Sequence, residues 1–114
     1  IAPDKPTNLT VTNITSRSAE ISWQDPENHG RYGFSRFWIE LKKDNSLILN
    51  ITTGKVNKYE INNLTPDTTY EISVAAESDY YGLGEESITS FLTSKEGECL
   101  KNRICLMQGG KATL

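Results

Sequence analysis

The chain has 114 residues, of which 36% are hydrophobic, and its formal net charge is -3 at pH 7. This length allows one domain with one core, and no stretch approaches the ~20 consecutive apolar residues that a membrane helix needs. The acidic balance argues against a nucleic-acid-binding protein, because such proteins usually present a basic stripe.

Short runs of alternating apolar and polar residues follow one another along the chain. Strands are predicted at residues 8–14, 18–25, 36–43, 47–53, 58–64, 70–78 and 88–94. Residues 26–35 and 78–87 are predicted loops, because glycines punctuate both. In the fourth strand, Leu47, Leu49 and Ile51 should share one face. No helical period is sustained, so the pattern predicts an all-β, seven-stranded antiparallel sandwich.

The stretch that begins at Leu64 predicts a structural feature rather than a binding site. Tyr70 has the same parity as Ile72 and Val74, so its ring should be buried at the start of a strand. A buried hydroxyl needs a hydrogen-bond partner, and the backbone of the preceding turn is the nearest source. We therefore expect a tyrosine corner, with Leu64 in the core and Pro66 fixing φ in the connection.

Several of these segments together resemble a fibronectin type III domain. The matching features are "PTNLTV" at Pro6–Val11, Trp23 in "ISW", the Leu64/Pro66/Thr68/Tyr70 pattern, and "GLGEES" before the last predicted strand. The resemblance covers about Asp4 to Ser94 and is strongest to repeats of receptor-type protein tyrosine phosphatases and related cell-adhesion receptors. It implies an immunoglobulin-like sandwich with Trp23 in the core, acting as a non-catalytic binding or spacer module among tandem repeats. Residues 95–114 would then form a C-terminal extension or linker.

The residues themselves also argue against catalysis. His29 is the only histidine, and it lies in a polar predicted loop. The sequence has no Cys-x-x-Cys pair, His-Glu-x-x-His motif or P-loop. The carboxylates of Asp25, Glu27, Glu85 and Glu86 fall in predicted loops, where charged side chains are usually solvated. We expect no enzymatic activity, no metal site and no cofactor.

Trp38 is one candidate for partner binding. It has outward parity in its strand, and tryptophan is enriched at the centres of protein interfaces. The alternative is that its ring lies over the stem of Arg36 or Lys42 on an exposed sheet face.

Two loops form a second candidate. Tyr80 and Tyr81 precede Gly82, and residues 27–33 carry His29, Arg31 and Tyr32. In the fold that the resemblance implies, both loops lie at the sandwich end opposite the tyrosine corner, where aromatic side chains can anchor a partner. The alternative is that one of the two tyrosines packs against the sandwich and that His29 is merely solvated.

Four Asn-x-Ser/Thr sequons point to a secreted or cell-surface protein. They begin at Asn8, Asn13, Asn50 and Asn63, and N-linked glycans are attached at this motif. Chance in a chain rich in Asn and Thr is the alternative. The polar start of the chain lacks the pattern of a signal peptide, so we expect a domain excised from a longer protein.

Cys99 and Cys105 lie near the C-terminus with five residues between them. An oxidising compartment would favour a bridge between them. Two bridges to a following domain, or a reduced pair, are the alternatives.

These features favour an extracellular interaction and spacer module, in the ectodomain of a type I membrane receptor. Its partners would be a protein ligand or neighbouring domains of the same chain, and not nucleic acid. The alternatives are a structural repeat of an intracellular muscle-type giant protein, or a spacer domain of a secreted enzyme.

Overall fold

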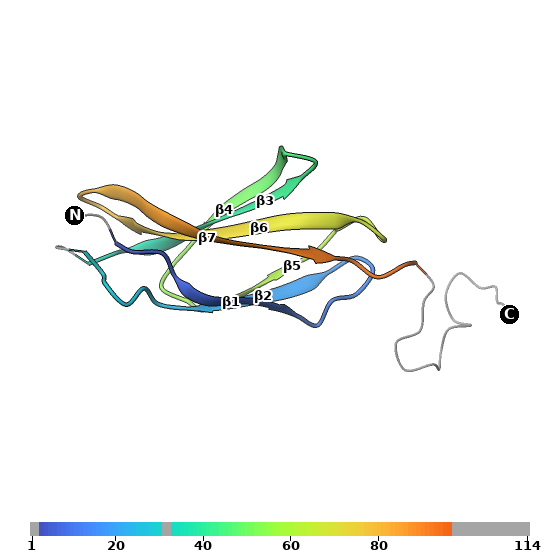
Figure 1. The fold of residues 1–114 in the computed structure, drawn as a ribbon, viewed down its shortest axis with the longest axis horizontal. Helices are drawn as coiled ribbons and strands as arrows, with labels where there is room; N and C mark the ends of the chain where they lie inside the picture. Colours follow the sequence, from blue (N-terminus) through green and yellow to red (C-terminus); the bar gives the residue numbers. More distant parts are fainter. Residues whose placement is uncertain (1–2, 31–32, 97–114) are drawn as a thin grey trace, which may run out of the picture.

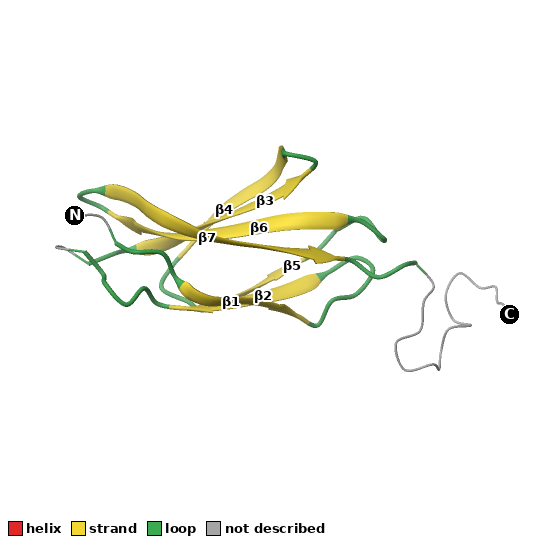
Figure 2. Ribbon diagram, in the orientation of Figure 1, coloured by secondary structure: helices red, strands yellow, loops and turns green. Residues whose placement is uncertain are grey.

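The computed structural model describes residues 3–30 and 33–96. Within these residues seven strands form two antiparallel sheets, which confirms the predicted all-β sandwich (Figures 1 and 2). The strands are β1 (Thr7–Thr12), β2 (Ala19–Gln24), β3 (Arg36–Lys43), β4 (Ser46–Thr53), β5 (Lys58–Ile61), β6 (Thr69–Ser78) and β7 (Gly82–Leu92). One sheet has the order β1-β2-β5, and the other has the order β4-β3-β6-β7.

The core lies between the two sheets and is built by residue alternation. In β2, Ala19, Ile21 and Trp23 are buried while the residues between them are partly accessible. Trp23 packs edge-on against Phe37 of β3, with ring centroids 5.3 Å apart. Burial of a large aromatic side chain supplies much of the stability of a domain of this size, and Trp23 therefore ties the two sheets together.

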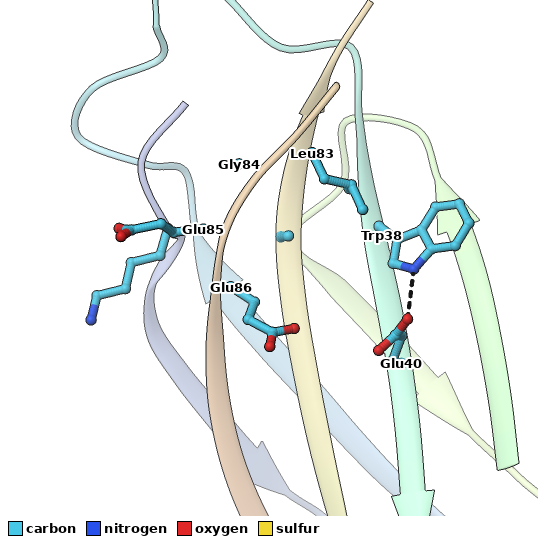
Figure 3. A pocket seen from close by; sticks show the side chains of 8 residues that line it. Trp38, Glu40, Leu83, Gly84, Glu85 and Glu86 are labelled. Atoms are coloured by element: carbon cyan, nitrogen blue, oxygen red, sulfur yellow. Dashed lines mark hydrogen bonds between the residues drawn. The ribbon is translucent and has the colours of Figure 1, made fainter. Parts of the chain in front are cut away.

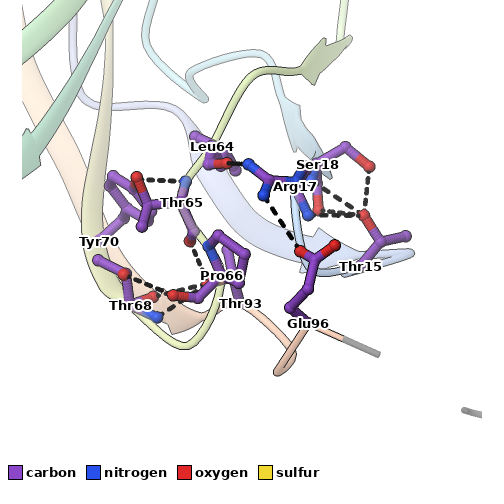
Figure 4. Close-up of polar contacts among 10 residues, drawn as sticks. All are labelled: Thr15, Arg17, Ser18, Leu64, Thr65, Pro66, Thr68, Tyr70, Thr93 and Glu96. Carbon is purple, nitrogen blue, oxygen red and sulfur yellow. Dashed lines mark hydrogen bonds and ion pairs between the residues drawn. The ribbon is translucent and has the colours of Figure 1, made fainter. Parts of the chain in front are cut away.

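The tyrosine corner joins the sheets at one end of the sandwich (Figure 4). The backbone N–H of Thr65 donates to the Tyr70 hydroxyl at 2.9 Å, and Leu64 is buried behind this contact. Thr93, which the sequence did not single out, is buried beside it. The Thr93 hydroxyl accepts from the Thr68 N–H at 2.9 Å and donates to the Thr65 carbonyl at 2.7 Å. Two hydroxyl groups therefore fix the path of this connection.

The start of β7 differs from the prediction. The strand begins at Gly82 and not at Ile88, so Glu85 and Glu86 lie in a strand and the predicted loop was wrong. Of the two glycines in this segment, Gly82 alone has a positive φ, 82°, as the turn requires. Gly84 is needed for a different reason, because a Cβ there would overlap the carbonyl oxygen of Pro3.

The apolar residues of β4 are also placed differently. The register pairs Leu41 with Leu49 and Lys42 with Leu47, so Ile48 is an extra residue in a β-bulge. Leu47 and Leu49 therefore do not share a face, and both are exposed together with Ile48. Figure 1 shows the β3–β4 turn projecting away from the three-stranded sheet.

Candidate interaction site

The outer face of the four-stranded sheet bears an open pocket of about 470 Å³. We name it the Trp38 pocket, and its lining residues are Lys5, Trp38, Glu40, Ala75, Leu83, Gly84, Glu85 and Glu86 (Figure 3). It spans β3, β6 and the first part of β7, and the segment before β1 contributes Lys5.

The strand register determines the shape of the Trp38 pocket. Ala75 of β6 pairs with Trp38 on one side and with Glu86 on the other. The Ala75 side chain is too small to fill the space between its neighbours, so it forms the floor. In the next row of the sheet Glu77 pairs with Leu83, and Figure 3 shows Leu83 reaching across β6 towards Trp38. The result is a small depression with an indole on one side and a carboxylate on the other.

The Trp38 side chain is held by a neighbour on its own strand. Its indole N–H donates to a Glu40 carboxylate oxygen at 3.2 Å, and Trp38 remains partly accessible. The Arg36 guanidinium, considered above as a stacking partner, binds Glu77 at 3.2 Å and Asp79 at 2.7 Å. Trp38 therefore has a fixed orientation on the outer face, as its parity predicted.

Acidic groups dominate the charge of the Trp38 pocket. Three lining residues, Glu40, Glu85 and Glu86, are acidic and one, Lys5, is basic, which leaves a formal excess of two negative charges. An indole beside carboxylates is suited to a cation on an apolar stem, since the ring attracts the charge and the carboxylates accept hydrogen bonds. Lysine and arginine side chains have this chemistry.

An ionic cluster lies next to the Trp38 pocket, towards the β6–β7 turn. The hydrogen bond from Arg36, and then the one from the Ser35 hydroxyl at 2.9 Å, lower the pKa of Asp79. The same hydrogen bond to Asp79, followed by the one to Glu77, raises the pKa of Arg36. The cluster joins the start of β3 to the end of β6 and orients the turn that follows.

Aromatic residues occupy the loops at this end of the sandwich. Tyr80 is 70% exposed, and its ring meets that of Tyr81 edge-on at 5.0 Å. The Ser78 hydroxyl accepts from the backbone N–H groups of both tyrosines, at 3.0 and 3.1 Å. His29 is exposed and lies edge-on to the buried Phe34 ring at 5.1 Å. Figure 1 shows the β2–β3 loop and the β6–β7 turn at the same end, opposite the tyrosine corner.

Some predicted site residues lie outside the described part of the chain. They are Arg31, Tyr32, Cys99 and Cys105, so the proposed disulfide and part of the loop site stay predictions. The boundary between residues 94 and 95 also stays a prediction.

The four sequon asparagines are all exposed. The Asn8 amide donates to the Gln24 side chain and the Asn13 amide donates to the Glu20 carboxylate, each at 2.7 Å. Asn50 lies within β4 and Asn63 in the turn before the tyrosine corner. Their glycosylation stays a prediction.

Two further findings concern residues 3–30 and 33–96. These residues contain no group of three or more His, Cys, Asp or Glu side chains arranged to hold a metal ion. They also form no helix with the length and hydropathy needed to cross a bilayer.

Known proteins resemble this chain in sequence and in structure. The receptor-type tyrosine-protein phosphatase mosPTP-1 of Aedes aegypti is 32% identical over 104 residues, which cover 83% of this chain and 8% of that protein. Titin of Drosophila melanogaster is 27% identical over 97 residues, covering 82% of this chain and, to the nearest percent, 0% of titin. The chain therefore spans less than a tenth of the length of these relatives.

Structural similarity extends over the same part of the chain. Domains d3–d4 of the rat CD45 extracellular region superpose with a TM-score of 0.74 and 22% identity, covering 82% of this chain and 51% of that one. The family model described as "Fibronectin type III domain" matches residues 4–92. With its seven-stranded sandwich and its tyrosine corner, this chain belongs to the fibronectin type III domain family, whose domains are non-catalytic modules.

Proposed function

We propose that this chain is a non-catalytic, extracellular interaction and spacer module of a cell-surface adhesion or signalling receptor, and that it binds a partner protein at the Trp38 pocket. The observation that carries the proposal is the row in which Trp38 and Glu86 flank the small side chain of Ala75. We assign to this depression a lysine or arginine side chain from the partner.

The pocket offers each part of such a side chain a matching surface. The apolar stem would lie over Ala75 and against Leu83, which is 47% exposed. The cationic head would meet the Trp38 ring and the Glu86 carboxylate. Because Glu40 already holds the indole N–H, the ring would need little reorganisation on binding.

The β6–β7 turn would extend this contact. Ser78 pairs with Gly82 and Glu77 pairs with Leu83, so Tyr80 and Tyr81 lie at the tip of the hairpin whose next residues line the Trp38 pocket. Exposed tyrosines contribute contact area at low entropic cost. A partner that fills the pocket would therefore also touch this turn.

The relatives support a cell-surface location. A receptor-type phosphatase and the extracellular region of CD45 are both similar to this chain, and four exposed sequons agree with them. Titin is also similar, which supports the second candidate, a structural repeat of a muscle-type giant protein.

The pocket proposal can be tested with a blocked arginine peptide as the probe. Titration into labelled protein should shift the NMR signal of the Trp38 indole N–H, whereas the same peptide with norleucine should leave that signal in place. The variant Glu86→Gln should weaken the response. The matched variant Glu71→Gln should not, because Glu71 pairs with Lys42, two outer-face rows away from Trp38. Equal responses to both peptides, or to both variants, would refute the assignment.

The location needs a separate experiment on the full-length parent protein. An antibody against this domain should label intact cells that express the parent. Labelling only after permeabilisation would overturn the extracellular part of the proposal and favour the structural repeat.

A further inference from the structure

Edge strands present unpaired backbone groups that can pair with another chain. Among the described residues, the edges of the two sheets are β1 and β5 in one, and β4 and β7 in the other. Charges protect two of these edges, because β5 carries Lys58 and Glu60 while β7 carries Glu85 and Glu86. The strands β1 and β4 contain no charged residue.

The sequons follow the opposite distribution. Each uncharged edge strand contains one sequon asparagine, Asn8 in β1 and Asn50 in β4, and neither charged edge contains any. The β1 edge has additional protection, since its register shifts between Thr7 and Thr10 and the Ser87 hydroxyl of β7 donates to the carbonyl of Pro6 just before it. A glycan therefore matters most at β4.

The β4 edge is the more exposed of the two. Leu47 is 51% exposed and Ile48 is 52% exposed, and Leu49 follows at 38%. The strand is rich in β-branched and apolar residues and contains neither charge nor proline, which is the composition of segments that pair between chains. Two copies of β4 could approach each other without like-charge repulsion.

We propose that Asn50 carries an N-linked glycan whose structural role is to prevent the β4 edge from pairing with a second copy of this chain. This inference depends on the extracellular location proposed above. Asn50 is exposed in the middle of the strand, next to Leu49. A bulky, hydrated glycan at that point would cover the apolar segment and obstruct the approach of another strand.

The same glycan would limit access to the Trp38 pocket from one side. Asn50 pairs with Glu40, and Thr52 pairs with Trp38, so the attachment point lies one strand away from the pocket lining. The partner protein would then approach from the β7 side, where Leu83 and the β6–β7 turn are accessible.

The test uses this chain secreted from glycosylating cells. Thr52→Ala removes the sequon and keeps Asn50, and Thr65→Ala is the matched control that removes the sequon of Asn63 in the turn before the tyrosine corner. Both threonines are exposed. We expect Thr52→Ala to lose the mass of one N-glycan and to self-associate with rising concentration in sedimentation velocity. The Thr65→Ala variant should remain monomeric.

A second substitution links self-association to the edge itself. Ile48→Lys, added to Thr52→Ala, places a charge on the exposed edge and should restore the monomer. A monomeric Thr52→Ala variant, or a double variant that still self-associates, would overturn the proposed role of the glycan. An unmodified Asn50 in a chain whose other sequons are modified would overturn the glycan assignment. Chain made without glycans should self-associate wherever the parent protein lives, so this result is independent of the location test.

Discussion

The tyrosine corner and the ionic cluster at the opposite end of the sandwich are held together by different kinds of contact. At the tyrosine corner, the hydroxyls of Tyr70 and Thr93 bind backbone groups, and both side chains are buried. At the opposite end, Arg36 binds Asp79 through charged side chains at the surface, and Tyr80 is largely exposed.

The difference follows from what each end must do. Buried backbone groups have to be hydrogen-bonded, so the corner leaves little freedom in the chain path. The contacts of the ionic cluster at the opposite end involve charged side chains at the surface, which water can also solvate. That end can therefore give up contacts to a partner at small cost to the fold, and substitutions at both ends, together with one pH experiment, test this difference.

The largest effect should come from the core that both ends share. Trp23→Ala should lower the free energy of unfolding by ~3–5 kcal/mol, because it leaves a cavity beside Phe37. Trp38→Ala, the same change on the outer face, should lower it by less than about 1 kcal/mol. Urea unfolding measures both. Equal losses of unfolding free energy in the two variants would contradict the structure, in which Trp23 lies in the core and Trp38 on the outer face.

At the corner, Thr93→Val should lower the free energy of unfolding by about 1–3 kcal/mol, since it leaves the Thr68 N–H and the Thr65 carbonyl without their buried partner. Thr12→Val, at an exposed strand position, is the matched control and should change the free energy of unfolding by no more than about 0.5 kcal/mol. A Thr93→Val variant as stable as the control would show that Thr93 does not stabilise the corner.

Tyr70→Phe keeps the ring and removes only the acceptor for the Thr65 N–H. We expect a loss of about 1–2 kcal/mol in unfolding free energy, because one backbone group loses its partner. Tyr59→Phe removes a hydroxyl from the other sheet and should change stability less. If the two variants lose equal stability, the corner contact adds nothing specific.

The tyrosine corner could be predicted from the sequence more readily than the Trp38 pocket, for a physical reason. The parity of Tyr70 with Ile72 and Val74 already implies a buried hydroxyl, and a buried hydroxyl implies a nearby partner. Thr93 was missed because one threonine near the end of a strand has no distinguishing pattern. Its role depends on contact with residues some 25 positions earlier.

The Trp38 pocket depends on register, which alternation within one strand cannot reveal. Trp38 was found by its parity, but Ala75 and Glu86 become its neighbours only through pairing across three strands. Leu83 was missed because two glycines made its segment resemble a loop. Gly84 is in fact a strand residue that lets the chain near Pro3 pass close by, a contact between segments that are far apart in the sequence.

That close approach gives the next prediction. Gly84→Ala should lower the free energy of unfolding by about 1 kcal/mol or more, because the new methyl group overlaps the backbone carbonyl of Pro3 and the buried segment around Pro3 has to shift. Gly54→Ala is the control, since a Cβ there meets nothing within 4 Å. The NMR signals of Lys5 should shift in the Gly84→Ala variant alone. An undisturbed Lys5 would show that the N-terminal segment does not form this side of the pocket.

The smallest effect should be the pH-dependent contribution of the ionic cluster to stability, and it distinguishes the two ends most directly. The pKa of Asp79 is lowered in the folded state by the hydrogen bonds from Arg36 and Ser35. A lowered folded pKa means that Asp79 adds stability above the ordinary aspartate pKa of about 3.9. This contribution is lost as the pH falls through the folded value.

The stability difference between the parent and Asp79→Asn should therefore be present near neutral pH and disappear in acid. High salt should reduce it as well, because the cluster is exposed to solvent. The cost of Thr93→Val should be the same under all these conditions, since no group that titrates takes part in those hydrogen bonds. If the Asp79 difference persisted in acid and in salt, the cluster would be acting through packing rather than charge. The cluster, like the corner, would then stabilise the fold independently of pH and salt.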